Sequence, residues 1–167
     1  MITTVTLNAS IDKAYFMEKA IENGTVMRVA TCRNSAGGKG LNVARTAKLC
    51  GADVQATGFA GGFNGKYLQH LLTLDQIPHD FVEVEGETRS CINILDPKYH
   101  STEYLEPGFE LTAADEQEFM ARFPEIIKDS GKSKRSKNNG ERRKYTMNKS
   151  EHKAYIDTLF IFTRPVD

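Results

Sequence analysis

The chain has 167 residues, in which Lys plus Arg and Asp plus Glu number 22 each, so its formal net charge is zero. A chain of this length falls within the single-domain range of about 100–200 residues. Zero net charge excludes an overall attraction to nucleic acid, to acidic membranes or to polyanionic substrates. The charges are unevenly distributed, because residues 128–153 hold ten Lys or Arg against three acidic residues, whereas the part before them is net acidic.

The cysteines and the first residues bear on the cellular compartment. Cys32, Cys50 and Cys91 are odd in number, widely spaced and form no C-x-x-C pair, which argues against a disulfide framework and a zinc site. The first residues have neither the basic region nor the long apolar run of a signal peptide, and no stretch approaches the ~18 apolar residues of a membrane span. We therefore expect a cytoplasmic protein with no membrane partner.

The chain begins with a strand pattern and then a helix pattern. Residues 2–7 are β-branched and apolar, and they predict a core strand that ends in a polar turn at Asn8 and Ser10. A glycine loop at residues 37–40 precedes a predicted helix that ends at Gly51. Its apolar residues recur at three-residue steps, namely Leu41, Ala44, Ala47 and Cys50.

The same alternation continues after this helix. Residues 54–59 predict a second buried strand, Gly61-Gly62 a turn, and residues 66–74 a helix with its inward side chains at Leu68, Leu71 and Leu72. Strand, helix, strand and helix in succession are typical of an α/β fold with parallel strand pairing.

Two stretches interrupt the alternation. Residues 26–33, and residues 81–95 continuing into 102–105, are extended segments that follow one another without helices, and they predict a small separate sheet. Beyond them, Thr112 is predicted to cap a helix that is weakened toward its end by Pro124. Its first turns carry Asp115 and Glu116, and its apolar face is predicted to consist of Phe119, Met120, Phe123, Ile126 and Ile127.

The last part of the chain has a different composition. Residues 132–149 are dense in Lys, Arg, Asn and Ser and predict disorder, because they cannot bury enough apolar surface to offset the cost of ordering. Nucleic-acid binding through this segment is the weaker alternative, since no aromatic platform accompanies the charge. Residues 155–163 are apolar enough for one strand, yet a lone strand without a partner is not stable. We therefore predict a mostly disordered tail over residues 132–167.

The glycine loop is the sharpest local signal. It is not a Walker A loop, because Gly40 follows Lys39 where Ser or Thr is needed and Arg33 stands at the upstream glycine position. It is not a dinucleotide fingerprint either, because Val43 stands where the third glycine is required. What remains is a loop whose backbone N–H groups approach a polar ligand at a helix N-terminus.

The loop and the residues after it resemble a family signature. Gly37-Gly38-Lys39-Gly40-Leu41-Asn42-Val43-Ala44-Arg45, with Gly51 and Gly61 beyond it, is similar to the first signature of the PfkB sugar kinases. Residues 6–13, 86–89 and 106–108 resemble the 1-phosphofructokinase and tagatose-6-phosphate kinase branch of that family. The likeness runs from Met1 to about Ile127.

The resemblance implies a fold and a division of the chain. Members of the family fold as a ribokinase-like α/β sandwich with a small β-sheet lid that closes over the sugar. Residues 1–131 would form the N-terminal portion of that domain, with lid segments at about 26–33 and 81–105. Residues 132–167 would lie outside it.

The resemblance also implies roles for individual residues. Asp12, at the end of the first strand, would hold sugar hydroxyls, and Arg89 in the lid would bind the phosphate already on the substrate. The backbone of Gly37 and Gly38 would fix the sugar ring together with Asn42, and Lys39 and Arg28 would be helpers. Taken singly, Asp12 reads as a turn cap and Arg89 as a solvated strand residue, so only their joint occurrence favours binding. The four histidines have no ligand spacing, and we assign neither a metal ligand nor a catalytic residue.

Two departures from the family bear on activity. Ala9 stands where the branch has Pro, which removes no ligand group. The Gly-Ala-Gly-Asp motif, around which the family places its catalytic base and nucleotide pocket, does not occur in this sequence, so we expect the site for ATP and Mg²⁺ to be absent from it. Residues 148–151 imitate a magnesium-related Asn-x-x-Glu motif, a match that chance explains.

The reaction implied by the resemblance is ATP-dependent phosphorylation of a ketohexose phosphate, fructose 1-phosphate to fructose 1,6-bisphosphate. We expect this chain to be truncated and inactive. The alternative is a non-catalytic sugar-phosphate-binding fragment, or the product of a truncated or frameshifted gene. We also expect a homo-oligomer formed through the lid or through an exposed sheet edge, and no nucleic-acid partner.

Overall fold

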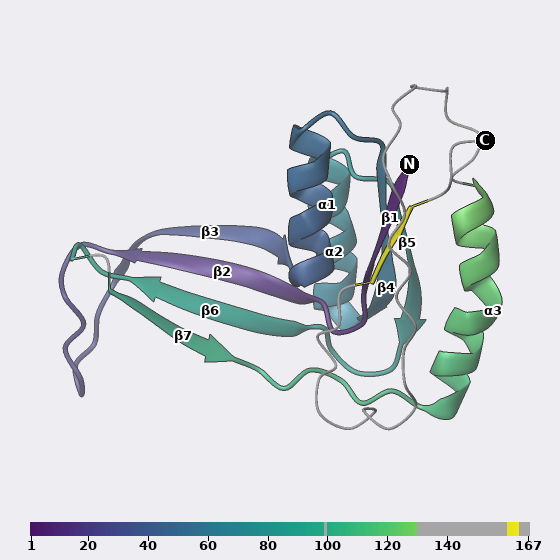
Figure 1. Cartoon of the computed structure of the whole chain (residues 1–167). Helices are drawn as coiled ribbons and strands as arrows, with labels where there is room; N and C mark the ends of the chain where they lie inside the picture. The colour runs from purple at the N-terminus through teal and green to yellow at the C-terminus, as the bar shows by residue number, and fades with distance from the viewer. Residues whose placement is uncertain (99, 130–159, 164–167) are drawn as a thin grey trace.

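The computed structural model describes residues 1–98, 100–129 and 160–163 (Figure 1). Their eleven elements form two sheets and three helices: β1 Ile2–Thr6, β2 Ser10–Met17, β3 Val29–Gly37, α1 Lys39–Leu49, β4 Val54–Gly61, α2 Gly62–Leu74, β5 His79–Val84, β6 Arg89–Leu95, β7 Ser101–Leu105, α3 Ala113–Asp129 and β8 Phe160–Thr163. None of the helices in this described part is long and apolar enough to cross a membrane.

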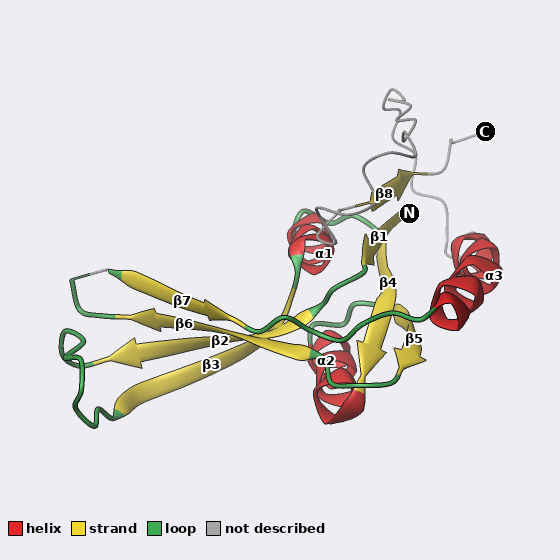
Figure 2. Ribbon diagram, turned by 90° about the horizontal axis from the view of Figure 1, so that it is seen from below, coloured by secondary structure: helices red, strands yellow, loops and turns green. Residues whose placement is uncertain are grey.

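The first sheet is the core of an α/β sandwich. Its strand order is β5-β4-β1-β8, in which β1, β4 and β5 run parallel and β8 runs antiparallel to β1. Helices α1 and α2 cover one face and α3 covers the other (Figures 1 and 2). The strands therefore bury apolar side chains on both faces, as parallel sheets do. The α1 and α2 side includes Leu41, Ala56, Leu68 and Leu72, and the α3 side includes Val5, Phe59, Val82 and Phe119. The predicted α/β fold with parallel strand pairing is confirmed.

The second sheet is the predicted lid. Its strand order is β3-β2-β6-β7, and it projects from the sandwich as a long ribbon (Figure 2). Two details of the prediction are wrong. Residues 10–17 form β2, although the sequence analysis placed only a turn at Asn8–Ser10, and the lid's second half starts at Arg89 rather than at residue 81. Residues 81–84, which were assigned to the lid, belong instead to β5, His79–Val84, of the core sheet, because Val82 and Val84 are buried against α3.

The end of α1 follows the prediction. Gly51 has a φ of 82°, a conformation that costs glycine little. Its N–H donates to the carbonyl of Lys48 at 2.9 Å, and the N–H of Ala52 donates to the carbonyl of Ala47 at 3.0 Å. This pair of hydrogen bonds is the Schellman motif, which satisfies carbonyls that the helix itself leaves unpaired.

Helix α2 begins four residues earlier than predicted. Gly61 ends β4 and Gly62, with a φ of 66°, starts the helix, so the two glycines do not form a separate turn. The carboxylate of Glu87, from the loop before β6, accepts hydrogen bonds from the backbone N–H groups of Phe63, at 3.2 Å, and Asn64. A carboxylate on the first N–H groups of a helix satisfies them and complements the helix dipole. The helix therefore starts where a distant residue caps it.

Helix α3 begins at the predicted cap. The N–H of Thr112 donates to the carboxylate of Asp115 at 2.8 Å, and the N–H of Asp115 donates to the Thr112 hydroxyl at 3.2 Å, which is a capping box. The predicted apolar face is partly wrong, because Met120 is 68% exposed. Its neighbour Phe119 is buried, and adjacent helical residues point about 100° apart. The helix continues through Pro124 to Asp129.

One prediction about the tail is wrong, and another lies outside the described residues. Disorder was predicted for residues 132–149, which the structure does not describe. Strand β8, Phe160–Thr163, lies inside the predicted tail and has a partner, because it pairs antiparallel with β1 from Ile2↔Thr163 to Val5↔Phe160. An exposed sheet edge was expected, and at β1 that edge is covered by a segment of the same chain.

A carboxylate organises the connection between β6 and β7. Asp96 is 7% exposed, and its Oδ1 accepts hydrogen bonds from the N–H groups of Lys98, at 2.8 Å, and His100, at 3.1 Å. Its Oδ2 lies 3.1 Å from Nδ1 of His100. Burial by itself raises the pKa of Asp96, but these hydrogen bonds and the charge of His100 outweigh burial and hold that pKa below its ordinary value.

We predict that Asp96 titrates below the ordinary Asp pKa of about 3.9. Because the folded-state pKa is lowered, the carboxylate stabilises the fold above the unfolded-state pKa, and this contribution is lost as the pH falls through the folded-state pKa. An NMR titration of the Asp96 carboxyl carbon measures the midpoint, and Asp96→Asn identifies the signal. A midpoint at or above about 3.9 would contradict the prediction.

Candidate functional site

A cavity lies between the lid sheet and the N-terminal end of α1. Its volume is about 330 Å³, within the usual size range of small-molecule sites. The strands β2, β3, β6 and β7 line it together with the glycine loop and α1. The lining residues are Ser10, Asp12, Lys13, Ala14, Arg33, Ser35, Gly38, Lys39, Asn42, Arg89, Cys91, Ile92, Asn93, Glu103 and Leu105.

One face of the lid sheet supplies most of this lining. Side chains on a strand alternate between faces, so every second residue and its partners on neighbouring strands share a face. The register pairs Ser10 with Gly37 and Arg89, and it pairs Asp12 with Ser35 and Cys91. The next row on the same face consists of Ala14, Arg33, Asn93 and Glu103. Strand pairing therefore brings Asp12 and Arg89, 77 positions apart in the sequence, into adjacent rows.

Asp12 lies against the glycine loop. It is the third residue of β2, not the end of the first strand as predicted. The hydroxyl of Ser10 donates to its Oδ1 at 2.7 Å. Gly37 is buried beside it, and a methyl group at Gly37 would overlap all three atoms of the Asp12 carboxylate. The absence of a side chain at Gly37 is thus what makes room for the Asp12 carboxylate at the cavity.

The loop then turns directly into α1. Gly38 precedes the helix with a φ of 117°, and a methyl group there would lie 2.5 Å from Cγ2 of Thr6. The residue before the helix, Gly38, has no side chain with which to cap it, so the first N–H groups are not taken by an N-cap side chain. Lys39 and Asn42, the first and fourth residues of α1, both line the cavity. A helix N-terminus with a Lys beside it favours anionic and hydroxyl ligands.

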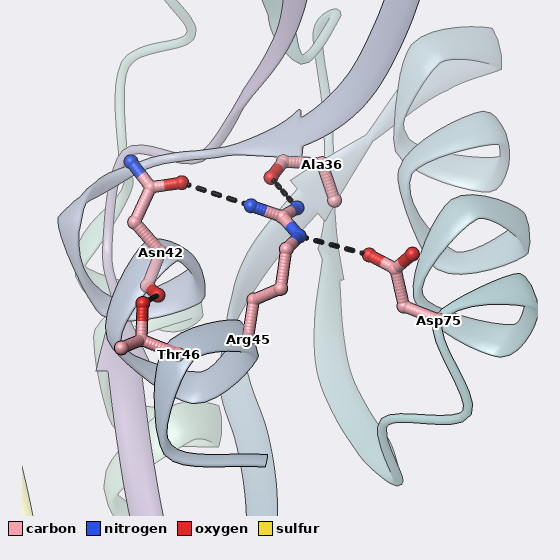
Figure 3. A network of polar contacts seen from close by, with 5 residues as sticks. All are labelled: Ala36, Asn42, Arg45, Thr46 and Asp75. Atoms are coloured by element: carbon pink, nitrogen blue, oxygen red, sulfur yellow. Dashed lines mark hydrogen bonds and ion pairs between the residues drawn. The ribbon is translucent and has the colours of Figure 1, made fainter. Parts of the chain in front are cut away.

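Asn42 is held by a second residue of the same helix. Nη1 of Arg45 donates to Oδ1 of Asn42 at 3.0 Å, and Nη2 donates to the carbonyl of Ala36 at 2.6 Å (Figure 3). Nε of Arg45 donates to Oδ2 of Asp75 at 3.1 Å. One guanidinium therefore connects the cavity residue Asn42 to the end of β3 and to the C-terminal end of α2.

Arg89 reaches the cavity from the start of β6. Its Nη1 and Nη2 lie 3.4 Å from the carbonyls of Glu106 and Asn8. Glu106 is itself tied to β6, because its carboxylate accepts the N–H of Ser90 at 2.7 Å. A methyl group at Gly108 would lie 2.6 Å from Oδ1 of Asn8. Residues 6–13, 86–89 and 106–108, which are far apart in the sequence, therefore meet around Arg89.

The charge of the cavity favours a phosphorylated ligand. Arg33 and Arg89, on the same face of the lid sheet as Asp12 and Glu103, and Lys39 of α1 place three basic side chains at the cavity against two acidic ones. Three minus two leaves a formal excess of one positive charge, whereas the chain as a whole is neutral. A site lined by one sign of charge concentrates ligands of the opposite sign.

The structure brings together most of the predicted site residues. Five of them line the cavity, namely Asp12, Gly38, Lys39, Asn42 and Arg89. Gly37 is not part of the lining, but it lies directly beside the Asp12 carboxylate. Arg28 does not line it, because this residue is exposed in the connection between β2 and β3.

Sequence reasoning missed five polar residues of the lining, Ser10, Lys13, Arg33, Ser35 and Asn93, together with Glu103. The available signal was that every second residue of a strand faces the same side, which groups Arg33 with Ser35 and Gly37, and Arg89 with Cys91 and Asn93. It could not be used without the strand register, because β2 was not recognised as the strand between them.

Comparison with known proteins identifies the family. The family model described as pfkB family carbohydrate kinase matches residues 5–122, which is most of this chain. The chain therefore belongs to the PfkB carbohydrate kinase family. Tagatose-6-phosphate kinase from Staphylococcus epidermidis is 38% identical over 130 residues, which are 78% of this chain and 41% of that protein.

Solved structures agree with this assignment. A possible 1-phosphofructokinase from Thermotoga maritima has a TM-score of 0.69 and 34% identity over 76% of this chain and 41% of that one. Phosphofructokinase-2 from Escherichia coli in complex with fructose-6-phosphate has a TM-score of 0.68 and 27% identity over 74% of this chain and 41% of that one. The chain thus spans about two fifths of the length of these relatives.

Proposed function

We propose that this chain binds the sugar-phosphate acceptor of a PfkB kinase, and that the acceptor is a ketohexose phosphate, with fructose 1-phosphate as the first choice. The observation that carries the proposal is the convergence of Asp12, Lys39, Asn42 and Arg89 on one positively charged cavity. A carboxylate and an amide hydrogen-bond hydroxyl groups, and a guanidinium binds phosphate through two parallel hydrogen bonds.

Each group has a distinct task in this proposal. Asp12 holds the sugar hydroxyls, and the backbone of Gly37 and Gly38 fixes the ring together with Asn42. Arg89, with Lys39 as a helper, binds the phosphate that the substrate already carries. Positioning an acceptor in this way is a large part of phosphoryl-transfer catalysis, because the protein supplies mainly geometry and charge. Arg28, which lies outside the cavity lining, stays a predicted helper without a contact to support it.

The reaction proposed for a whole protein of this kind is ATP-dependent phosphorylation of fructose 1-phosphate to fructose 1,6-bisphosphate. ATP with Mg²⁺ would supply the phosphoryl group. Among the described residues, no group of three or more His, Cys, Asp or Glu side chains gathers in a way that could hold a metal ion. We derive no transfer step from these residues, and the inactivity of this chain alone stays a prediction.

Tagatose 6-phosphate is the second candidate acceptor. It is favoured by the 38% identity to tagatose-6-phosphate kinase from Staphylococcus epidermidis. Self-association also stays a proposal, and it is supported by a relative, since phosphofructokinase-2 from Escherichia coli has a tetrameric inhibited form.

Calorimetry tests the proposed function. We expect the chain to bind fructose 1-phosphate more tightly than either fructose or inorganic phosphate, since each of these offers only half of the contacts. Arg89→Ala is expected to weaken binding by about tenfold to a hundredfold, because a hydrogen bond to a charged group contributes about 1.5–3 kcal/mol. Lys66→Ala is the matched control, since it removes an exposed positive charge of α2 that does not line the cavity.

Two outcomes would contradict the proposal. The assigned phosphate contact is wrong if fructose 1-phosphate binds and Arg89→Ala leaves its affinity unchanged. The assigned ligand class is wrong if neither fructose 1-phosphate nor tagatose 6-phosphate binds to the folded chain. A coupled assay of ADP release on the same preparation should show no turnover, and turnover that disappears in Asp12→Ala would refute the predicted inactivity.

A further inference from the structure

We propose that Arg45 is a positioning residue for the candidate site, and that it holds the Asn42 amide with its NH2 group available to the ligand. Arg45 does not line the cavity, whereas Asn42 does. This inference takes its ligand, a ketohexose phosphate, from the proposed function. It assigns a role to Arg45, which had none in the proposed function, and it makes Asn42 a hydrogen-bond donor to the ligand.

The orientation of the amide follows from the chemistry of its neighbour. A guanidinium carries five donors and no acceptor, so the group of Asn42 that faces it must be the carbonyl oxygen. Oδ1 lies 3.0 Å from Nη1 of Arg45, and Nδ2 points away from the guanidinium (Figure 3). The NH2 group of Asn42 is therefore the group left to donate a hydrogen bond to a ligand. Its partner on the ligand must be an acceptor, such as a hydroxyl or phosphate oxygen.

Arg45 is itself held at three points, which makes it a rigid support. Besides Asn42, it donates to the carbonyl of Ala36, at 2.6 Å, and to the carboxylate of Asp75, at 3.1 Å. Ala36 is fully buried and directly precedes Gly37, so the same guanidinium supports both Asn42 and the start of the glycine loop. A planar fork that donates in three directions suits arginine, and lysine cannot reproduce it.

The plain alternative is that Arg45 only ties α1 to α2. Lys48 provides a matched comparison, because it lies one helical turn further along α1 and donates to the carbonyl of Gln76, next to Asp75. Lys48 makes the same kind of link between α1 and the end of α2 without contacting Asn42. A purely structural role for Arg45 would therefore give Arg45→Ala and Lys48→Ala similar effects on ligand affinity.

The first test is a double-mutant cycle on fructose 1-phosphate affinity. Arg45→Ala is expected to weaken binding by about tenfold, the equivalent of one well-placed hydrogen bond, and Lys48→Ala is expected to leave affinity unchanged. In an Asn42→Ala background, Arg45→Ala should weaken binding little further, because the group through which it acts is gone. Asn42→Asp keeps the acceptor for Arg45 but lacks the donor, so it should lose affinity while the thermal stability of the fold is retained.

The second test does not depend on a ligand. The side-chain NH2 group of Asn42 can be followed by NMR relaxation, with Asn42→Asp identifying its signals. We expect a rigid amide in the wild type and faster picosecond-to-nanosecond motion in Arg45→Ala, with no change in Lys48→Ala. This readout separates the positioning role of Arg45 from the proposed function. If the wild type binds no ketohexose phosphate, the proposed function is wrong, and the amide measurement still decides whether Arg45 holds Asn42.

The results that would overturn the positioning role are specific. Equal weakening by Arg45→Ala with and without Asn42→Ala would show that Arg45 acts independently of Asn42. Equal loss of affinity in Lys48→Ala would assign the effect to the contact between helices. An Asn42 amide that is as rigid in Arg45→Ala as in the wild type would contradict the proposal whether or not the ligand binds.

Discussion

Replacing Gly37 by alanine is expected to weaken sugar-phosphate binding strongly while the chain remains folded. The φ of Gly37 is not in the left-handed region, so alanine can adopt its backbone conformation. The new methyl group, however, would occupy the space of the Asp12 carboxylate. Asp12 must then rotate away and lose the 2.7 Å hydrogen bond from Ser10. We expect about a hundredfold loss of fructose 1-phosphate affinity, because hydrogen bonds to a charged group contribute about 1.5–3 kcal/mol each.

Calorimetry on a set of matched variants checks this result. Gly24→Ala is the control for a methyl group added away from the cavity, because it meets no atom within 4 Å and Gly24 does not line the cavity. Its φ of 77° makes alanine strained there, so the thermal stability of this variant is measured alongside its affinity. Asp12→Ala should weaken binding to a similar degree, and the double variant should be no worse than either single one, since both changes remove the same carboxylate. Wild-type affinity in Gly37→Ala would show that the position of Asp12 beside the glycine loop is not required for binding.

Removing strand β8 is expected to make the chain self-associate. β8 pairs with β1 over four residues, and without it β1 presents unpaired backbone N–H and C=O groups at the edge of the core sheet. Such an edge is a template for pairing with a second copy. Each backbone hydrogen bond contributes about 0.5–1.5 kcal/mol net, so the loss of even two lowers the free energy of unfolding by about 1–3 kcal/mol.

Two truncations separate the strand from the residues that follow it. A chain that ends at Leu159 lacks β8, whereas a chain that ends at Thr163 keeps it. Sedimentation velocity should show concentration-dependent association only for the shorter chain, and thermal unfolding should show its lower stability. If both truncated chains match the full-length chain in mass and stability, β8 does not protect β1.

Several local features could be predicted from the sequence, because they depend on neighbouring residues alone. The end of α1 at Gly51 requires only a glycine that tolerates a positive φ. The start of α3 requires only Thr112 and Asp115, which satisfy each other's N–H groups. The glycine loop before α1 was recognised for a similar reason, because the first turn of a helix leaves N–H groups exposed whatever surrounds it.

Other features depended on contacts between distant segments. Residues 10–17 and 79–84 are both extended, and which sheet each joins is decided by burial: β2 is buried only at its start, whereas Val82 and Val84 pack against α3. The start of α2 at Gly62 is set by Glu87, a residue 25 positions away. No periodicity in the sequence carries such information, because the partner lies on another element.

The family, the α/β sandwich and the glycine loop were determined by the sequence through its motifs, whereas the roles of Asp12 and Arg89 toward a phosphorylated sugar were implied by the family resemblance and stay a proposal. The tertiary structure alone decided that these residues share one cavity, because only strand register places Asp12 and Arg89 in adjacent rows of the lid. It also decided the role proposed for Arg45, whose three acceptors come from three elements, and the partner of β8. The physical reason is that hydrogen-bond partners and strand neighbours are chosen by proximity in space, which spacing along the chain does not specify.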